Sequence, residues 1–129
     1  MAINILIVDD SSVMRAMILK TMRMSGLPIG ETYQAANGQE GLDALEQHWI
    51  DLAIVDINMP VMNGEEMIDR MQENPDTKDI PIVVISTEGS ETRIERLQGK
   101  GASFIQKPFT PEIIRDTIMA ITGIGESDE

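Results

Sequence analysis

Three carboxylates follow two apolar segments of the chain, at the points where those segments end. Asp9 and Asp10 come directly after the largely apolar run 4–8, and Asp56 comes directly after 52–55. Such runs, bounded by polar residues, predict strands buried on both faces of a parallel sheet, where ligands bind outside the carboxyl ends of the strands. Three negative charges at one place are unfavourable unless a hard cation lies among them. The spacing therefore predicts a Mg²⁺ site built around a nucleophilic carboxylate.

Two further side chains are expected at the same edge of the sheet. Ser86 follows a fourth predicted strand, and Lys107 follows a fifth. A carboxylate can attack phosphorus and form an acyl phosphate, and the transferred group then needs positive charge at its oxygens. Lys107 can supply that charge, and the hydroxyl of Ser86 can donate to another oxygen. Together with the carboxylates, the two side chains indicate phosphoryl chemistry.

Taken singly, each of these residues has a simpler explanation. Asp9 or Asp10 could cap the following helix, and Asp56 could end a strand in a turn. Ser86 could be a turn hydroxyl, and Lys107 a solvated surface lysine. Four strand ends that all carry a suitable group are less easily explained in this way, so the pattern as a whole favours a functional site.

The rest of the chain alternates between strand and helix signals. Strands are predicted at 4–8, 31–36, 52–55, 82–85 and 103–106, and a helix is predicted after each of them. This alternation predicts an α/β fold: a doubly wound, five-stranded parallel sheet with five helices in a three-layer sandwich. We expect Met17 in the first helix and Trp49 at the end of the second to face inward. The fourth helix, 90–100, has only Ile94 and Leu97 as strongly apolar residues, so it should be the most loosely held.

The composition excludes several classes of protein. The 129 residues include 22 acidic and 10 basic ones, a net charge of −12, which opposes binding to nucleic acid or to anionic membranes. There is no cysteine, so disulfides and thiolate chemistry are excluded. No apolar stretch approaches the ~18 residues that span a bilayer, and no signal peptide is recognisable. We expect a soluble cytoplasmic protein.

These motifs together resemble the receiver domains of two-component response regulators. The resemblance extends from Ile3 to about Ile124 and rests on the segments 5–10, 55–60, 62–64, 85–86, 101–102 and 107–109. It implies a flavodoxin-like sandwich with strand order 2-1-3-4-5. It also implies a receiver domain over residues 1–124, followed by a short acidic tail, 125–129.

The resemblance implies a role for each residue of the acidic cluster. Asp56 would be phosphorylated by a histidine kinase. Asp10, Asp56 and the main-chain oxygen of Asn58 would bind Mg²⁺, or Mn²⁺, while Asp9 would act through water. Asn58 and Glu88 would tune dephosphorylation, which decay measurements on their alanine variants would test.

The resemblance also implies how the site would signal. Ser86 and Lys107 would contact the phosphoryl group, and the peptide bond between Lys107 and Pro108 would be cis. Phe104 occupies the position of the family's switch aromatic, so Ser86, Phe104 and Ile94 are expected to link the site to an output surface. Ser86 replaces the commoner threonine, and Phe104 lacks the hydroxyl of the frequent tyrosine.

The chain is expected to be a stand-alone, monomeric response regulator of the single-domain, CheY-like type. It would be a phosphoacceptor signalling protein that catalyses only its own phosphorylation and dephosphorylation. Its output would be protein binding, with a flagellar motor component as the expected partner in chemotaxis and with a possible phosphatase as a further partner. The main alternative is a phosphorelay shuttle that passes the phosphoryl group to a histidine phosphotransfer protein.

Two alternatives from other classes fit the residues less well. A flavin-binding electron carrier would need a phosphate-cradling loop after the first strand, where the segment 9–12 would instead repel phosphate. A Mg²⁺-dependent phosphatase with an aspartyl nucleophile would need a segment that covers its substrate, and no segment here is long enough.

Overall fold

Strands and helices alternate along the chain in this computed structural model, which describes residues 2–57, 59–87 and 89–123. The elements are β1 (Ile3–Val8), α1 (Ser12–Met24), β2 (Ile29–Ala35), α2 (Gly38–Gln47), β3 (Leu52–Val55), α3 (Gly64–Glu73), β4 (Ile82–Ser86), α4 (Glu91–Gly99), β5 (Ala102–Gln106) and α5 (Pro111–Thr122). All strand pairs are parallel, in the order β2-β1-β3-β4-β5. The predicted doubly wound α/β fold and its strand order are confirmed.

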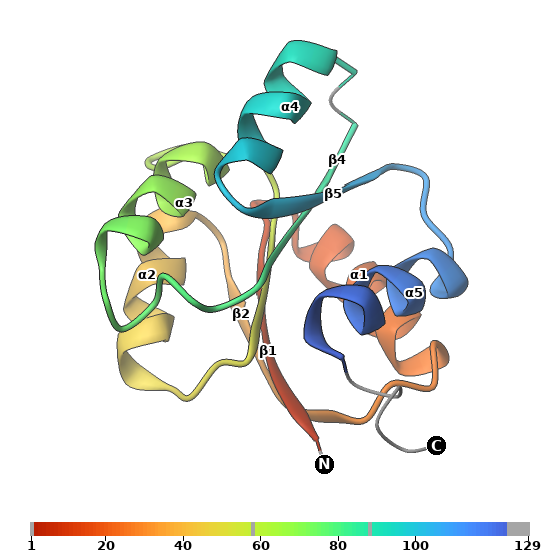
Figure 1. Ribbon diagram of the computed structural model, residues 1–129. Helices are drawn as coiled ribbons and strands as arrows, with labels where there is room; N and C mark the ends of the chain where they lie inside the picture. Colours follow the sequence, from red (N-terminus) through yellow and green to blue (C-terminus); the bar gives the residue numbers. More distant parts are fainter. Residues whose placement is uncertain (1, 58, 88, 124–129) are drawn as a thin grey trace.

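Helices cover both faces of the sheet (Figure 1). On one face, α1 and α5 pack on Ile5 and Ile7, and on the other, α2 and α3 pack on Leu6 and Val8. Successive residues of β1 thus point to opposite faces, and all four are buried because each face is covered. This double burial explains why the strands are almost continuously apolar.

Each helix begins at a side chain that accepts a hydrogen bond from its first turn. The caps are Ser11, Asn37, Asn63, Ser90 and Thr110. Because the Ser11 hydroxyl accepts the Met14 amide at 3.2 Å, neither preceding aspartate caps α1. Among the described residues, no helix is both long and apolar enough to cross a membrane.

Two residues that we predicted to face inward are exposed. Met17 is 51% exposed because Met14, Ile18 and Met22 define the buried stripe of α1, and Met17 is rotated about 100° from Ile18. Trp49 is 79% exposed, since α2 ends at Gln47. Its indole nitrogen donates instead to the Asp51 carboxylate at 3.0 Å. Both predictions were wrong because they extended a helical stripe beyond its true width or length.

Val61, in the loop between β3 and α3, adopts a backbone conformation that is unfavourable for a β-branched residue. Its φ is 69°, and the Met62 amide donates to the Pro60 carbonyl at 2.8 Å, which closes a γ-turn around it. The Val61 side chain is 82% exposed, so it gains no burial energy that could offset this strain. The turn is held instead by its surroundings, because Met59 and Met62 are buried and the Met62 carbonyl accepts the Gly38 amide at 2.9 Å.

Replacing Val61 with asparagine is therefore expected to stabilise the fold. Asparagine tolerates positive φ better than valine, so the gain should be about 0.5–1 kcal/mol and should appear as a higher melting temperature in calorimetry. Val13 is a matched control, because it is also exposed but lies in α1. Val13→Asn should change the melting temperature little, and an equal rise in both variants would contradict the explanation.

Candidate functional site

The strand order brings the predicted site residues to neighbouring strand ends. β3 lies between β1 and β4, and β5 follows β4. Val8 pairs with Val55 in the register, and the Asp56 amide donates to the Val8 carbonyl at 2.9 Å. The residues just beyond β1 and β3 therefore lie side by side, while Ser86 ends β4 and Lys107 follows β5.

The three carboxylates converge on one point. Asp9, Asp10 and Asp56 each offer an oxygen, and these oxygens lie within 4.8 Å of one another. Asp9 is buried, with only 2% of its surface exposed. Its Oδ1 accepts the Ser11 amide at 2.8 Å, whereas its Oδ2 is buried with no hydrogen-bond partner among the described residues. A buried oxygen of this kind, beside two further carboxylates, fits a hard divalent cation.

The electrostatics show that the cluster lacks positive charge. Burial raises the pKa of Asp9, and the charge of Asp10 raises it further. Burial also raises the pKa of Asp56, with the charge of Asp9 as the next contribution. Lys107 opposes both shifts, but its ammonium lies 3.9 Å from Asp9 Oδ2, which makes a loose ion pair. One lysine does not balance three carboxylates.

Asp56→Asn should accordingly stabilise the chain in metal-free buffer at neutral pH. A carboxyl whose pKa is raised by folding favours the folded state in its protonated form, so ionisation above that pKa weakens folding. The variant should melt a few degrees higher at neutral pH, as expected for roughly 1 kcal/mol of relieved repulsion. The difference should vanish as the pH falls through the raised pKa of Asp56 to its unfolded value. A difference that persists in acid would contradict the electrostatic explanation.

The backbone around Asp56 is held by close packing that requires a glycine. The Gly64 amide donates to the Ile57 carbonyl at 2.9 Å, and the Ile57 amide donates to Asp56 Oδ1 at 2.9 Å. A Cβ on Gly64 would overlap the carbonyl oxygen of Asp56. Gly64 thus allows α3 to begin against the main chain of Asp56, which gives the motif 62–64 a physical reason.

Ser86 and Phe104 share one face of the sheet. Val84 pairs with Phe104, and Ser86 pairs with Gln106. Because side chains alternate along a strand, Ser86 lies on the same face as Val84, diagonally next to Phe104. Ser86 is buried and Phe104 is partly buried. A rearrangement at Ser86 can therefore alter the packing of Phe104.

The ends of β4 and β5 are also joined through the backbone. The Lys107 amide donates to the Ser86 carbonyl at 2.9 Å, and the peptide bond between Lys107 and Pro108 is cis.

Two predicted residues, Asn58 and Glu88, lie outside the described residues.

Arg15 is a site residue that the sequence reasoning missed. Its guanidinium donates to the Asp9 carbonyl at 2.5 Å and to Gln34 Oε1 at 2.9 Å, so it joins α1 to the ends of β1 and β2. It lies in the first turns of α1, where the helical pattern predicts a solvent-facing residue. Nothing in its spacing indicates that it reaches back to the residue that follows β1.

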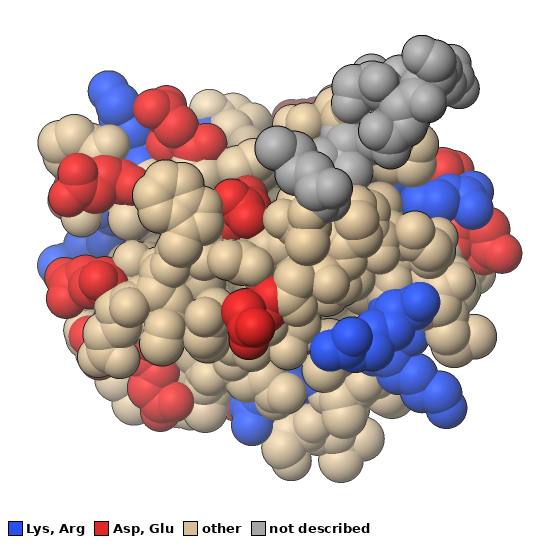
Figure 2. All heavy atoms as spheres, turned by 90° about the horizontal axis from the view of Figure 1, so that it is seen from below, with Lys and Arg blue, Asp and Glu red and all other residues tan. Residues whose placement is uncertain are grey.

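Acidic side chains alone do not distinguish the site. Figure 2 views the molecule from the end opposite the carboxyl ends of the strands. Red acidic side chains are spread over the left and centre of this view, and a group of basic ones lies at the lower right. The carboxylate cluster differs from these surface residues in its convergence and in the burial of Asp9.

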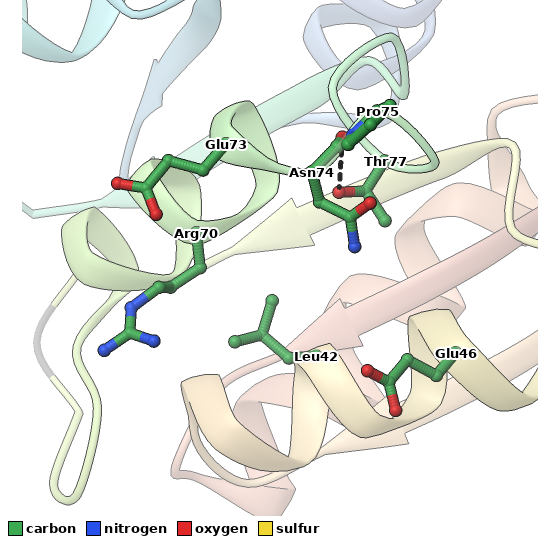
Figure 3. A pocket seen from close by; sticks show the side chains of 7 residues that line it. All are labelled: Leu42, Glu46, Arg70, Glu73, Asn74, Pro75 and Thr77. Carbon is green, nitrogen blue, oxygen red and sulfur yellow. Dashed lines mark hydrogen bonds between the residues drawn. The ribbon is translucent and has the colours of Figure 1, made fainter.

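A pocket of about 370 Å³ lies elsewhere, between α2 and α3 (Figure 3). Leu42 and Glu46 of α2 and Arg70 and Glu73 of α3 line it. None of the three converging carboxylates lines this pocket, so it is separate from the site.

Comparisons with known proteins agree with this geometry. The family described as response regulator receiver domain matches residues 5–119. The chain is 32% identical over 127 residues to a protein of Campylobacter jejuni named chemotaxis protein CheY homolog, over 97% of this chain and 96% of that protein. It is 33% identical over 125 residues to chemotaxis protein CheY1 of Helicobacter pylori, over 95% and 99% of the two chains. The solved structure of Vibrio cholerae chemotaxis protein CheY4 has a TM-score of 0.82 at 32% identity, over 94% of this chain and 99% of that one. The chain belongs to the response regulator receiver domains.

Proposed function

We propose that this chain is a response regulator in which Asp56 accepts a phosphoryl group from a histidine kinase, with Mg²⁺ as the cofactor. The observation that carries the proposal is the buried Oδ2 of Asp9, which has no hydrogen-bond partner among the described residues and forms only a loose ion pair with Lys107. It converges there with Asp10 and Asp56. This arrangement combines a site for a hard cation with a positive group for a phosphoryl oxygen. Membership in the receiver family supports the same reading.

The position of Asp56 in the sheet favours it as the nucleophile. β3 lies between β1, which carries the other two carboxylates, and β4, which carries Ser86. Asp9 is less suitable, because its side chain is buried, whereas Asp56 is only partly buried. In the proposed step, an oxygen of Asp56 attacks phosphorus, and the bond from phosphorus to the donor's imidazole nitrogen breaks. Lys107 and the Ser86 hydroxyl would then stabilise the phosphoryl oxygens.

The residues present fit Mg²⁺, which prefers oxygen ligands and needs only one or two carboxylates. Asp10 and Asp56 would hold the ion with the main-chain oxygen of Asn58, and Asp9 would act through water. Bound there, Mg²⁺ or Mn²⁺ would neutralise the carboxylates and reduce the negative charge that the phosphoryl oxygens meet.

Metal binding and labelling test this proposal together. Asp10→Ala should lower the affinity for Mg²⁺ tenfold or more in calorimetry, which corresponds to about 1.4 kcal/mol. It should also slow labelling by acetyl phosphate, and a chelator should stop labelling of the unaltered chain. Asp79→Ala is the control, because Asp79 is an exposed carboxylate outside the cluster. Equal Mg²⁺ affinity in the two variants would refute the metal site.

For the output, we propose phosphorylation-dependent binding of a partner protein in chemotaxis, with a flagellar motor component as the expected partner. The support is that proteins named as chemotaxis proteins match this chain over nearly their whole lengths. The partner surface would lie on α4, β5 and α5, around Ile94 and Phe104. Both residues are partly buried, so their exposure can change in either direction.

A second candidate function is that of a phosphorelay shuttle, which one feature of the surface favours. An apolar groove of about 410 Å³ runs beside Lys107 and is lined by Met14 and Met17 of α1 and by Pro108 and Phe109. A histidine phosphotransfer protein must bring its histidine close to Asp56, and a groove next to Lys107 suits such a docking partner. The two candidates differ in the surface that the partner needs, α4 or α1.

A further inference from the structure

Helix α4 has a thin apolar anchor. Of its nine residues, only Leu97 is buried, whereas Met67, Ile68 and Met71 of α3 are all fully buried. Burial of apolar surface is the dominant force that holds a helix on a sheet. The position of α4 must therefore depend more on its other contacts than the positions of its neighbours do.

A ladder of opposite charges joins α4 to α3. Arg96 of α4 donates from Nε to Glu65 Oε2 at 2.6 Å and from Nη2 to Glu65 Oε1 at 2.9 Å. The ammonium of Lys100 lies 2.6 Å from Asp69 Oδ1 and 3.3 Å from Glu65 Oε2. Glu65 and Asp69 lie four positions apart on α3, and Arg96 lies four positions before Lys100, the residue that caps the end of α4, so the charges meet on successive turns. We call these four residues the charge ladder.

The charge ladder contains a bidentate ion pair between Arg96 and Glu65, and a pair of this kind contributes to stability. Isolated surface pairs contribute little, but a bidentate arginine–carboxylate pair within a network is an exception. The Glu65 side chain is only 18% exposed, and the hydrogen bonds from Arg96 lower the pKa of its carboxyl. Glu65 also lies in the first turn of α3 and Arg96 in the last turn of α4, where the helix dipoles favour these charges.

The charge ladder begins next to the backbone of Asp56. Gly64, the residue before Glu65, packs against the Asp56 carbonyl so closely that it has no room for a Cβ. Its amide is hydrogen-bonded to the Ile57 carbonyl at 2.9 Å. A displacement of the main chain at Asp56 must therefore be passed to Gly64 and to Glu65.

We propose that Glu65 is a positioning residue, which holds α4 through the charge ladder and couples the state of Asp56 to the position of α4. This route runs through α3, and it is therefore distinct from the route through Ser86 and Phe104 on β4 and β5. The coupling rests on the proposed function of Asp56, whereas the hold on α4 does not.

Amide hydrogen exchange of the unphosphorylated chain tests the hold on α4. At low salt, exchange in 91–99 is expected to rise on the order of fivefold in Glu65→Gln and in Arg96→Gln. The double variant should show little further rise, because both changes remove the same interaction. Arg96→Lys keeps the charge but loses the bidentate geometry, so its exchange rate in α4 should lie between those of the unaltered chain and of Arg96→Gln. High salt should raise exchange in the unaltered chain towards that of the variants.

Glu66→Gln is the matched control, because it removes the same charge from the next, exposed residue of α3. This variant should exchange like the unaltered chain, and residues 38–47 of α2 should be unchanged in all variants. Unchanged exchange of α4 in Glu65→Gln, or an additive rise in the double variant, would overturn the proposed hold on α4.

A second measurement tests the coupling. Labelling by acetyl phosphate with Mg²⁺ is expected to change exchange in 91–99 of the unaltered chain, and Glu65→Gln should at least halve that change. The extent of labelling at Asp56 should stay the same, which separates coupling from a defect in the site. An undiminished response in Glu65→Gln would refute the coupling. If the unaltered chain takes no label at all, the proposed function and the coupling both fail, while the low-salt comparison still decides whether the ladder holds α4.

Discussion

Asp56→Asn is expected to abolish labelling by acetyl phosphate or by a histidine kinase. The amide is nearly the same size as the carboxylate but lacks the negative oxygen that attacks phosphorus. The fold should be retained, since the change removes one charge from a cluster in which burial already raises the pKa of Asp56. Intact-mass spectrometry after incubation with acetyl phosphate and Mg²⁺ would measure the loss directly.

An asparagine at another acidic position shows whether the loss is specific. Asp43 is exposed on α2, and Asp43→Asn should be labelled as fast as the unaltered chain. Labelling of Asp56→Asn at the normal rate would show that another residue accepts the phosphoryl group.

Ile94→Asp is expected to abolish phosphorylation-dependent binding of the output partner while leaving Asp56 labelling intact. In the proposed switch, a phosphoryl group on Asp56 draws the Ser86 hydroxyl inward through a charge-assisted hydrogen bond. The space left beside β5 then lets Phe104 rotate inward. Burial of apolar surface is worth about 25 cal/mol per Å², so a partial change in exposure of the ring gives ~1–2 kcal/mol. That amount shifts a two-state equilibrium roughly tenfold, which is a typical coupling.

Ile94 is the test position because it lies on the helix with the thinnest apolar anchor. Thr92→Asp is the control, since it adds the same charge to an exposed residue of the same helix. Partner affinity can be measured by titrating the labelled and unlabelled forms of each variant. Binding that survives Ile94→Asp but is lost in Met17→Asp would favour docking at the α1 groove and the phosphorelay shuttle.

The convergence of the carboxylates could be predicted from the sequence for a physical reason. Buried parallel strands are almost continuously apolar, so their ends are easily recognised at Asp9 and Asp56. A parallel sheet then gathers all carboxyl ends at one edge, whatever the details of side-chain packing. The same logic accounts for the confirmed fold class, and the capping pattern of Asn37 and Glu40 accounts for the start of α2.

Features that depend on three-dimensional packing could not be predicted in this way. The pair of Glu65 and Arg96 joins residues 31 positions apart, and neither residue is distinctive in its own helix. The positive φ of Val61 contradicts the preference of valine and follows only from the packed loop around it. The exposure of Trp49 depends on where α2 ends, and helix ends are the part of a periodic pattern that is least determined locally.

The role of Asp56 as the phosphoryl acceptor is tested most directly by locating the phosphoryl group on the unaltered chain. The chain is labelled with acetyl phosphate and Mg²⁺, and borohydride then reduces the acyl phosphate to a stable alcohol that peptide mass spectrometry can map. A single modified residue per chain is expected, at Asp56, and none when a chelator is present. Modification at Asp9 or Asp10 instead, label on His48, or no label at all would contradict this role.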